Sequence, residues 1–137
     1  MKRQLLAVLL IGVLSVDCNL FSSATSPSST GGSTTEVFSQ SLPVGGSSVY
    51  TFTVTTAGTV TVDLTSFGTA VAVGLGLGTS SGTGSTSCTL TSSSPSTLAG
   101  STPQISVTEN PGTYCVEIYD VGTLTAATSF SISIVHT

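Results

Sequence analysis

The sequence predicts an all-β chain, folded as an antiparallel β-sandwich of about seven or eight short strands. From Glu36 onward, apolar residues recur at every second position, in short runs that end at Gly, Pro or Asn. This alternation is typical of strands with one buried and one solvated face. Turn signals recur about every eight to twelve residues, and no segment of this part has helical spacing. A single sandwich domain over residues 36–137 follows from these observations.

The period-two pattern assigns an inward face to each strong strand. The residues expected to face the core are Tyr50, Phe52, Val54, Val60, Val62, Leu64, Val71, Val73, Leu75, Leu77, Tyr114, Val116, Ile118, Phe130, Ile132 and Ile134,. Because the turn 56–58 separates the first two runs, we expect them to form a hairpin. Weaker strands are expected near 86–90 and 104–108. Gly74 and Gly76 would leave the outer face of the third run nearly bare and open to a close neighbour.

The N-terminus has the features of an export signal. Lys2 and Arg3 are the two basic side chains of the chain, and residues 5–14 form an apolar run. That run stops well short of the roughly 20 residues that cross a bilayer as a helix. We therefore interpret residues 1–21 as a signal peptide, with a short buried helix as the alternative. The chain is expected to be exported, and either secreted or lipid-anchored at a bacterial cell envelope.

Two processing sites compete after the apolar run. Cys18 lies where a bacterial lipoprotein carries its lipidated cysteine, but the acidic Asp17 stands where that motif has a small residue. Cleavage near residues 22–24, which are small, would instead remove Cys18 with the signal. Residues 22–35 contain mostly Ser, Thr, Gly and Pro and are expected to form a flexible linker, which favours tethering. Both outcomes for Cys18 stay open.

The charge distribution excludes several classes of partner. The formal net charge is −4, and a chain cleaved after the signal would contain no Lys or Arg. Without cations it cannot neutralise phosphates or dock electrostatically on anionic lipid. We therefore expect no nucleic-acid partner, and a membrane contact only through a possible lipid anchor at Cys18. The expected partner is an extracellular protein or a polysaccharide of unknown identity.

Two cysteines remain in the expected domain. In an exported protein, Cys88 and Cys115 are most simply explained as a disulfide bond. In the chain-entropy relation, a loop of this length stabilises the fold by roughly 3.5 kcal/mol. We expect the bond to fix a Ser/Gly/Pro-rich loop to the strand of Tyr114. A metal site with His136 as third ligand is the alternative, although the spacing does not suit zinc.

Several motifs resemble the bacterial pre-peptidase C-terminal (PPC) domain. They are the run 46–54, Gly58 before 60–62, the turn 111–113 leading into the strand 114–118, and the closing strand 130–134. The resemblance covers roughly residues 36–137, and it implies a jelly-roll-like sandwich in a free-standing form. It also implies an accessory of a secreted enzyme, sometimes related to collagen- or carbohydrate-binding modules. The family often has acidic residues in its middle strand, whereas residues 70–75 contain none.

One motif suggests catalysis. Residues 78–82 match the G-x-S-x-G nucleophile elbow, and Ser80, Asp120 and His136 follow one another in the order of α/β-hydrolases,. An elbow requires a strand, a strained turn and a helix in a large parallel sheet, which this sequence does not predict. His136 is expected near the free C-terminus without a buried partner. We therefore expect no catalytic residue, with a serine hydrolase as the least favoured reading.

The remaining candidates concern binding. Calcium needs six to eight oxygen ligands, and a weak possibility is a site that draws on Asp63, Glu109, Glu117 and Asp120. Solvated surface acids are the default interpretation, so no cofactor is expected. Tyr119 is placed on the outer face as a candidate ligand contact, with cross-strand packing as the alternative.

Threonines on the first two runs could also form a flat hydroxyl array of the kind found in ice-binding proteins. They are Thr51, Thr53, Thr55, Thr59, Thr61 and Thr65. Thr is also the usual outward residue of a strand. The sequence as a whole predicts an exported, non-enzymatic binding or structural module. The alternative is a carbohydrate- or protein-binding accessory of a secreted hydrolase.

Overall fold

The structure is a computed structural model that describes residues 32–82, 84 and 86–137. The predicted signal peptide and Cys18 lie outside the described residues, as does the predicted linker up to residue 31. Thr34 and Thr35, which the sequence analysis assigned to the linker, already belong to the first strand. The ordered domain therefore begins at least two residues before Glu36.

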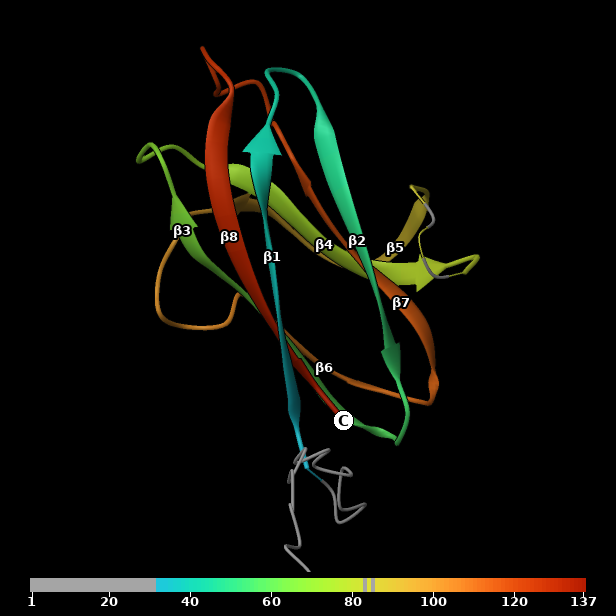
Figure 1. Cartoon of the computed structure of the whole chain (residues 1–137). Helices are drawn as coiled ribbons and strands as arrows, with labels where there is room; N and C mark the ends of the chain where they lie inside the picture. Colours follow the sequence, from blue (N-terminus) through green and yellow to red (C-terminus); the bar gives the residue numbers. More distant parts are fainter. Residues whose placement is uncertain (1–31, 83, 85) are drawn as a thin grey trace, which may run out of the picture.

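Eight strands form two antiparallel four-stranded sheets in the described part of the chain (Figure 1). The strands are β1 (Thr34–Leu42), β2 (Ser47–Val54), β3 (Gly58–Phe67), β4 (Val73–Ser80), β5 (Cys88–Thr97), β6 (Ile105–Glu109), β7 (Gly112–Tyr119) and β8 (Thr128–His136). Their orders are β1-β8-β3-β6 and β2-β7-β4-β5, which is the arrangement of a jelly roll,. The predicted fold class is confirmed. None of the described residues forms a helix that could span a membrane.

The predicted core is confirmed in nearly every position. Phe52, Val62 and Ile132 are representative, and each is buried between the sheets. Tyr50 and Val71 are only partly buried and pack at the margin of the core. β1 adds Phe38 and Leu42, which the sequence analysis did not place. Hydrophobic burial between two amphipathic sheets therefore accounts for the fold.

The predicted hairpin of the first two runs is wrong. β2 pairs with β7, whereas β3 pairs with β8 and β6, so the turn 55–57 passes from one sheet to the other. The amide of Thr55 donates to the carbonyl of Thr137 instead of closing a hairpin. A turn signal specifies that the chain reverses, but not which sheet the next strand joins. The threonines of β2 and β3 therefore share no common face, and the proposed hydroxyl array does not form.

The second sheet ends in an edge strand that the sequence analysis underestimated. β5 continues to Thr97 through the Ser/Pro stretch that was expected to be loop. Pro95 has no N–H to donate, and an edge strand with a bulge tolerates this,. Thr97 is buried, and its hydroxyl hydrogen-bonds to the hydroxyl of Ser94 at 2.6 Å. Polar contacts of this kind leave no apolar alternation in the sequence.

The outer face of β4 is covered by the chain itself. Gly74 lies opposite Tyr119 of β7, and a Cβ at Gly74 would lie 2.1 Å from the tyrosine ring. A Cβ at Gly76 would lie 2.6 Å from the side chain of Leu90 of β5. The bare glycine face was expected to admit a close neighbour, and the neighbours are these two side chains.

Four connections meet at one end of the sandwich. Odd-numbered strands run toward this end and even-numbered strands run away from it, so it carries residues 43–46, 68–72, 98–104 and 120–127. We call this surface the loop end. Figure 1 shows connections 43–46 and 120–127 at the top of the view, and the C-terminus and the start of β1 toward the bottom. The chain therefore enters the domain opposite the loop end.

Candidate functional site

The predicted disulfide bond is present. Cys88 and Cys115 are joined, with their Cα atoms 5.7 Å apart. Cys115 lies opposite Gly78 of β4, so the bond reaches from β7 to the first residue of β5 across β4. A Cβ at Gly78 would lie 2.0 Å from the carbonyl oxygen of Thr89, so glycine permits the close approach of β5 at the irregularity in the β4–β5 register,. The bond fixes the start of an edge strand, within the weaker strand that was expected near 86–90.

Ser80 lacks the surroundings of a nucleophile elbow. It is the last residue of β4, an antiparallel strand, and its hydroxyl donates to the carbonyl of Gly82 at 2.8 Å. Gly78, the first glycine of the motif, serves the close approach of β5 described above. The G-x-S-x-G match therefore reflects an irregularity in the β4–β5 pairing and the turn that follows β4.

Asp120 acts as a cap for two connections of the loop end. Its carboxylate accepts hydrogen bonds from the backbone N–H groups of Gly45, Gly122, Thr123 and Leu124, at 2.8 to 3.2 Å. The backbone hydrogen bonds, the largest of them from Gly45, hold the pKa of this carboxyl below its usual value,. The Asp120 carboxylate thus ties residues 43–46 to residues 120–127.

His136 is buried and has a carboxylate partner, contrary to the sequence analysis. Its side chain is 5% exposed, and Nε2 lies 2.8 Å from a carboxylate oxygen of the partly buried Glu36. The hydroxyl of Tyr50 donates to the other Glu36 oxygen, and this bond raises the pKa of Tyr50. The His136 ring lies 5.0 Å from that of Phe52. Glu36 and His136 belong to the first sheet and Tyr50 to the second, so the cluster connects the two sheets.

The sequence contained a signal for this cluster. The inward series Phe130, Ile132 and Ile134 leads to His136 at the next alternate position, and Glu36 precedes Phe38 in the same way. Extending the period by one step at each strand end would have placed both groups inward. Ser80, Asp120 and His136 are not assembled as a triad, since each has another hydrogen-bond partner.

The remaining carboxylates are dispersed. Asp63 accepts a hydrogen bond from the side-chain amide of Gln104 at 3.2 Å. Glu109 ends β6 and Glu117 lies within β7. Within residues 32–82, 84 and 86–137, no three His, Cys, Asp or Glu side chains gather as metal ligands. Tyr119 packs on Gly74, which is the alternative that the sequence analysis left open, and its role as a ligand contact stays a prediction.

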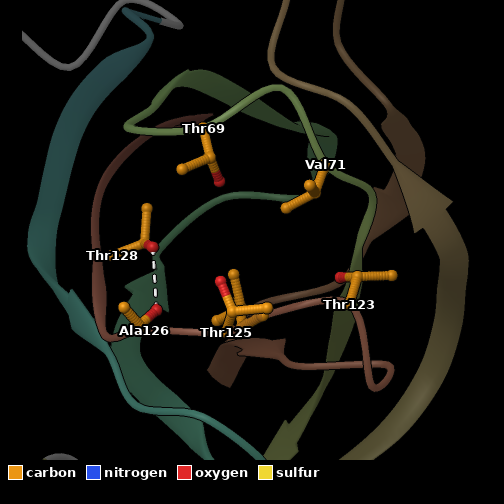
Figure 2. A pocket seen from close by; sticks show the side chains of 7 residues that line it. Thr69, Val71, Thr123, Thr125, Ala126 and Thr128 are labelled. Atoms are coloured by element: carbon orange, nitrogen blue, oxygen red, sulfur yellow. Dashed lines mark hydrogen bonds between the residues drawn. The ribbon is translucent and has the colours of Figure 1, made fainter.

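Two hollows lie at the loop end. The larger, of about 360 Å³, is lined by residues 67–70 together with Leu98 and Ala99. The smaller, of about 70 Å³, is lined by Thr69, Val71, Thr128 and residues 123–126, as Figure 2 shows in part. Thr69 lines both, so they are neighbours. Their walls come from three of the four connections.

Hydrogen bonds hold these walls in place. The N–H of Gly68 donates to the carbonyl of Ser129 at 2.9 Å, and that of Gly100 to the carbonyl of Leu64 at 3.0 Å. The Thr123 hydroxyl donates to the carbonyl of Ala72 at 2.6 Å. The side chain of Gln104 accepts from the N–H of Leu64, which fixes the end of connection 98–104. The hollows are therefore parts of the fold and do not depend on a ligand to form.

The loop end also carries most of the exposed large apolar side chains in the described residues. Val44, Leu98 and Val121 are 54%, 58% and 40% exposed, and all three belong to its connections. Val37, on β1, is the fourth. Asp120 is the one ionisable side chain in these connections, and the loops themselves satisfy it. A surface with exposed apolar side chains, built hollows and a single, hydrogen-bonded carboxylate is typical of a binding site.

Comparison with models of known protein families gives no match, and no curated protein is significantly similar to this chain.

Proposed function

We propose that this chain is an exported, non-catalytic module of the cell envelope or the secreted fraction, which binds a partner through its loop end. One observation carries the proposal. Ser80, Asp120 and His136 make hydrogen bonds within the fold. The exposed Leu98 lines the larger hollow, and two more exposed apolar side chains lie on other connections of the loop end. Such a division of residues suits recognition and offers no activated nucleophile.

Export is supported by the disulfide bond and by the charge distribution. Disulfides persist in oxidising compartments, and no Lys or Arg follows residue 3,. A lipid anchor at Cys18 and cleavage near residues 22–24 both remain compatible with the proposal. In either case the chain enters the domain at the start of β1, at the end of the sandwich opposite the loop end.

The mature N-terminus tests export directly. The full chain is expressed in a bacterial host and the extracted protein is analysed by mass spectrometry. A lipid-modified N-terminus at Cys18, or a free one between residues 22 and 25, is expected. A chain that retains residue 1 and two free thiols would contradict export.

A fluorophosphonate probe tests the absence of nucleophilic catalysis. No labelling of the purified protein is expected, because no general base contacts Ser80,. Labelling that disappears in Ser80→Ala would show that the chain is an enzyme.

Binding through the loop end is tested by depletion from solution. The mature protein is incubated with insoluble cellulose, chitin, peptidoglycan or collagen, and the unbound fraction is measured. Leu98→Asp should abolish binding, whereas Val37→Asp, a matched change at a 64% exposed valine on β1, should not. Equal loss in both variants would contradict the loop end as the binding surface.

A carbohydrate-binding accessory is the second candidate, and the position of Tyr119 favours it. Its ring lies over Gly74 on the outer face of the second sheet and stays partly exposed. Aromatic rings held in this way can stack on sugars. Tyr119→Ala would then remove polysaccharide binding, while Leu98→Asp would leave it intact. The PPC resemblance implies the same kind of accessory role.

A further inference from the structure

We infer that the loop end binds an uncharged, aliphatic segment of a partner protein. The inference rests on the proposed function and names the class of ligand for that surface. The larger hollow would receive an aliphatic side chain of the partner, and the threonines beside it would meet the partner's peptide groups.

The charge pattern restricts the ligand first. Glu36, Asp63, Glu109 and Glu117 lie outside the loop end, and the Asp120 carboxylate accepts four backbone hydrogen bonds. An anionic ligand would find no counter-charge at the loop end, since the described residues contain no Lys or Arg. A cationic ligand would meet only the Asp120 carboxylate, which already accepts four backbone hydrogen bonds, whereas a neutral ligand can cover the remaining surface without removing a further charge from water,.

The walls of the larger hollow restrict the ligand further. Leu98, Ala70 and Ala99 present aliphatic carbon, and Leu98 is 58% exposed. Phe67 is the one aromatic residue in the lining, and it is half-buried against the core. Sugars are commonly held on a broadly exposed aromatic ring, whereas Phe67 packs in part against the core,. The hollow's volume of about 360 Å³ suits one or two aliphatic side chains,.

The smaller hollow adds hydrogen-bonding groups that a plain hydrocarbon would leave unpaired. Figure 2 shows the hydroxyls of Thr69 and Thr125 directed toward its middle. Neither hydroxyl hydrogen-bonds to another group in the described part of the chain. A threonine hydroxyl both donates and accepts, and a peptide backbone offers both N–H and C=O groups. An acyl chain would bury these hydroxyls without partners, which disfavours it.

The connections that line the hollows are also preorganised. The hydrogen bonds from Gly68, Gly100 and Thr123 fix the three connections that line them. Little ordering of loops is then needed on binding, which favours measurable affinity for a short segment.

Isothermal titration of the mature protein with capped heptapeptides tests the inference. The probe is acetyl-Gly-Ser-Leu-Val-Leu-Ser-Gly-amide. The controls replace both leucines with lysine, with glutamate or with serine, and cellohexaose serves as a neutral sugar. Saturable binding of the leucine peptide alone is expected. Leu98→Asp should weaken that binding by about tenfold or more, because it introduces a charge at the rim of the hollow.

Two further variants keep the result interpretable. Ala99→Leu fills the hollow without adding charge and should weaken binding as Leu98→Asp does, whereas Val37→Asp should change it less than about twofold. Equal binding of the lysine or glutamate peptide, or no binding of the leucine peptide, would overturn the inference. Leu98-dependent binding of cellohexaose would overturn it while leaving the loop end as the binding surface. Light scattering tests whether the loop end binds a second copy of the chain. A dimer that depends on Leu98 would overturn the inference in favour of self-association.

Discussion

The two ends of the sandwich use their polar groups differently. At the end where β1 begins, polar groups connect separate elements: Glu36 joins His136 and Tyr50 across the sheets, and Thr137 bonds to the turn after β2. At the loop end, Asp120 bonds to the backbone of its own connection and of connection 43–46, and Gln104 accepts from the backbone of β3. Large apolar side chains remain outside. We call the end where β1 begins the braced end, because its polar groups hold the sheets together, and we propose that the loop end binds the partner. Changes at the two ends should therefore separate stability from binding.

Removing the disulfide bond should have the largest effect, since it secures the start of β5 near the braced end. Cys88→Ala with Cys115→Ala should lower the free energy of unfolding by roughly 3.5 kcal/mol, within a range of about 2 to 5. Urea unfolding of the double variant beside the oxidised wild type measures this change. If the urea midpoint were the same in the double variant, the oxidised wild type and the reduced wild type, the backbone hydrogen bonds between β5 and β4 alone would hold β5 in place. Binding of the leucine peptide should survive wherever the variant is folded.

The glycine face of β4 gives the next largest effect. Gly74→Ala should lower the free energy of unfolding by about 1 to 3 kcal/mol, because the new Cβ overlaps the Tyr119 ring,. The double variant with Tyr119→Ala should recover part of this loss, since the overlap is removed. Gly82→Ala is the matched control, since nothing lies within 4 Å of its would-be Cβ. A Gly74→Ala variant as stable as the control would mean that the ring is not packed there.

The inter-sheet cluster at the braced end should give a smaller, pH-dependent effect. Tyr50→Phe removes the hydrogen bond to Glu36 and should lower the free energy of unfolding by about 1 kcal/mol at neutral pH,. The pKa of Tyr50 is raised in the fold, so its contribution is complete below the unfolded pKa of about 10 and is lost as pH rises through the folded pKa,. Alkaline unfolding of wild type and variant should therefore converge. The pKa of Tyr114 is also raised, chiefly by burial. The wild type and Tyr50→Phe should therefore both lose some further stability as the pH rises through the pKa of Tyr114. If the unfolding free energies of wild type and variant differed by the same amount from pH 8 to 12, the role given to the Tyr50–Glu36 hydrogen bond would be contradicted.

The smallest effect is expected at the loop end. The pKa of Asp120 is lowered, so its contribution to stability is present above the unfolded pKa of about 3.9 and is lost as pH falls through the folded pKa,. Asp120→Asn should therefore make stability below about pH 4 less dependent on pH. Thermal unfolding between pH 2 and 6 measures this. A variant with the same acid profile as the wild type would show that another carboxyl group is responsible.

The features that follow from the alternation of apolar and polar residues could be predicted from the sequence. The extent and pairing of strands that depend on polar contacts could not. β8 alternates without interruption, and its inward residues were placed correctly up to Ile134. β5 has no apolar alternation, because its stability comes from a disulfide, from Leu90 over Gly76 and from the Thr97 hydroxyl, none of which repeats along the chain. The wrong hairpin has the same origin, since partner choice between sheets is decided by packing far along the sequence.

The candidate site was the least predictable part. The larger hollow brings together residues 67–70 and Leu98, which are about thirty positions apart and contain only Phe, Gly, Thr, Ala and Leu,. Such residues have no chemical signature in a sequence. They become a site only when the jelly roll brings their connections to one end. The chemically distinctive residues, Ser80, Asp120 and His136, instead have structural hydrogen-bond partners.

The chemical-shift map of the mature protein at saturating leucine peptide tests the central claim most directly, because every end and face of the domain is observed at once. Backbone amides in residues 68–72, 98–104 and 120–127 should shift, while those around Glu36, Tyr50 and His136 should not. Shifts confined to the braced end, or to the outer face around Tyr119, would contradict the claim that the partner binds at the loop end.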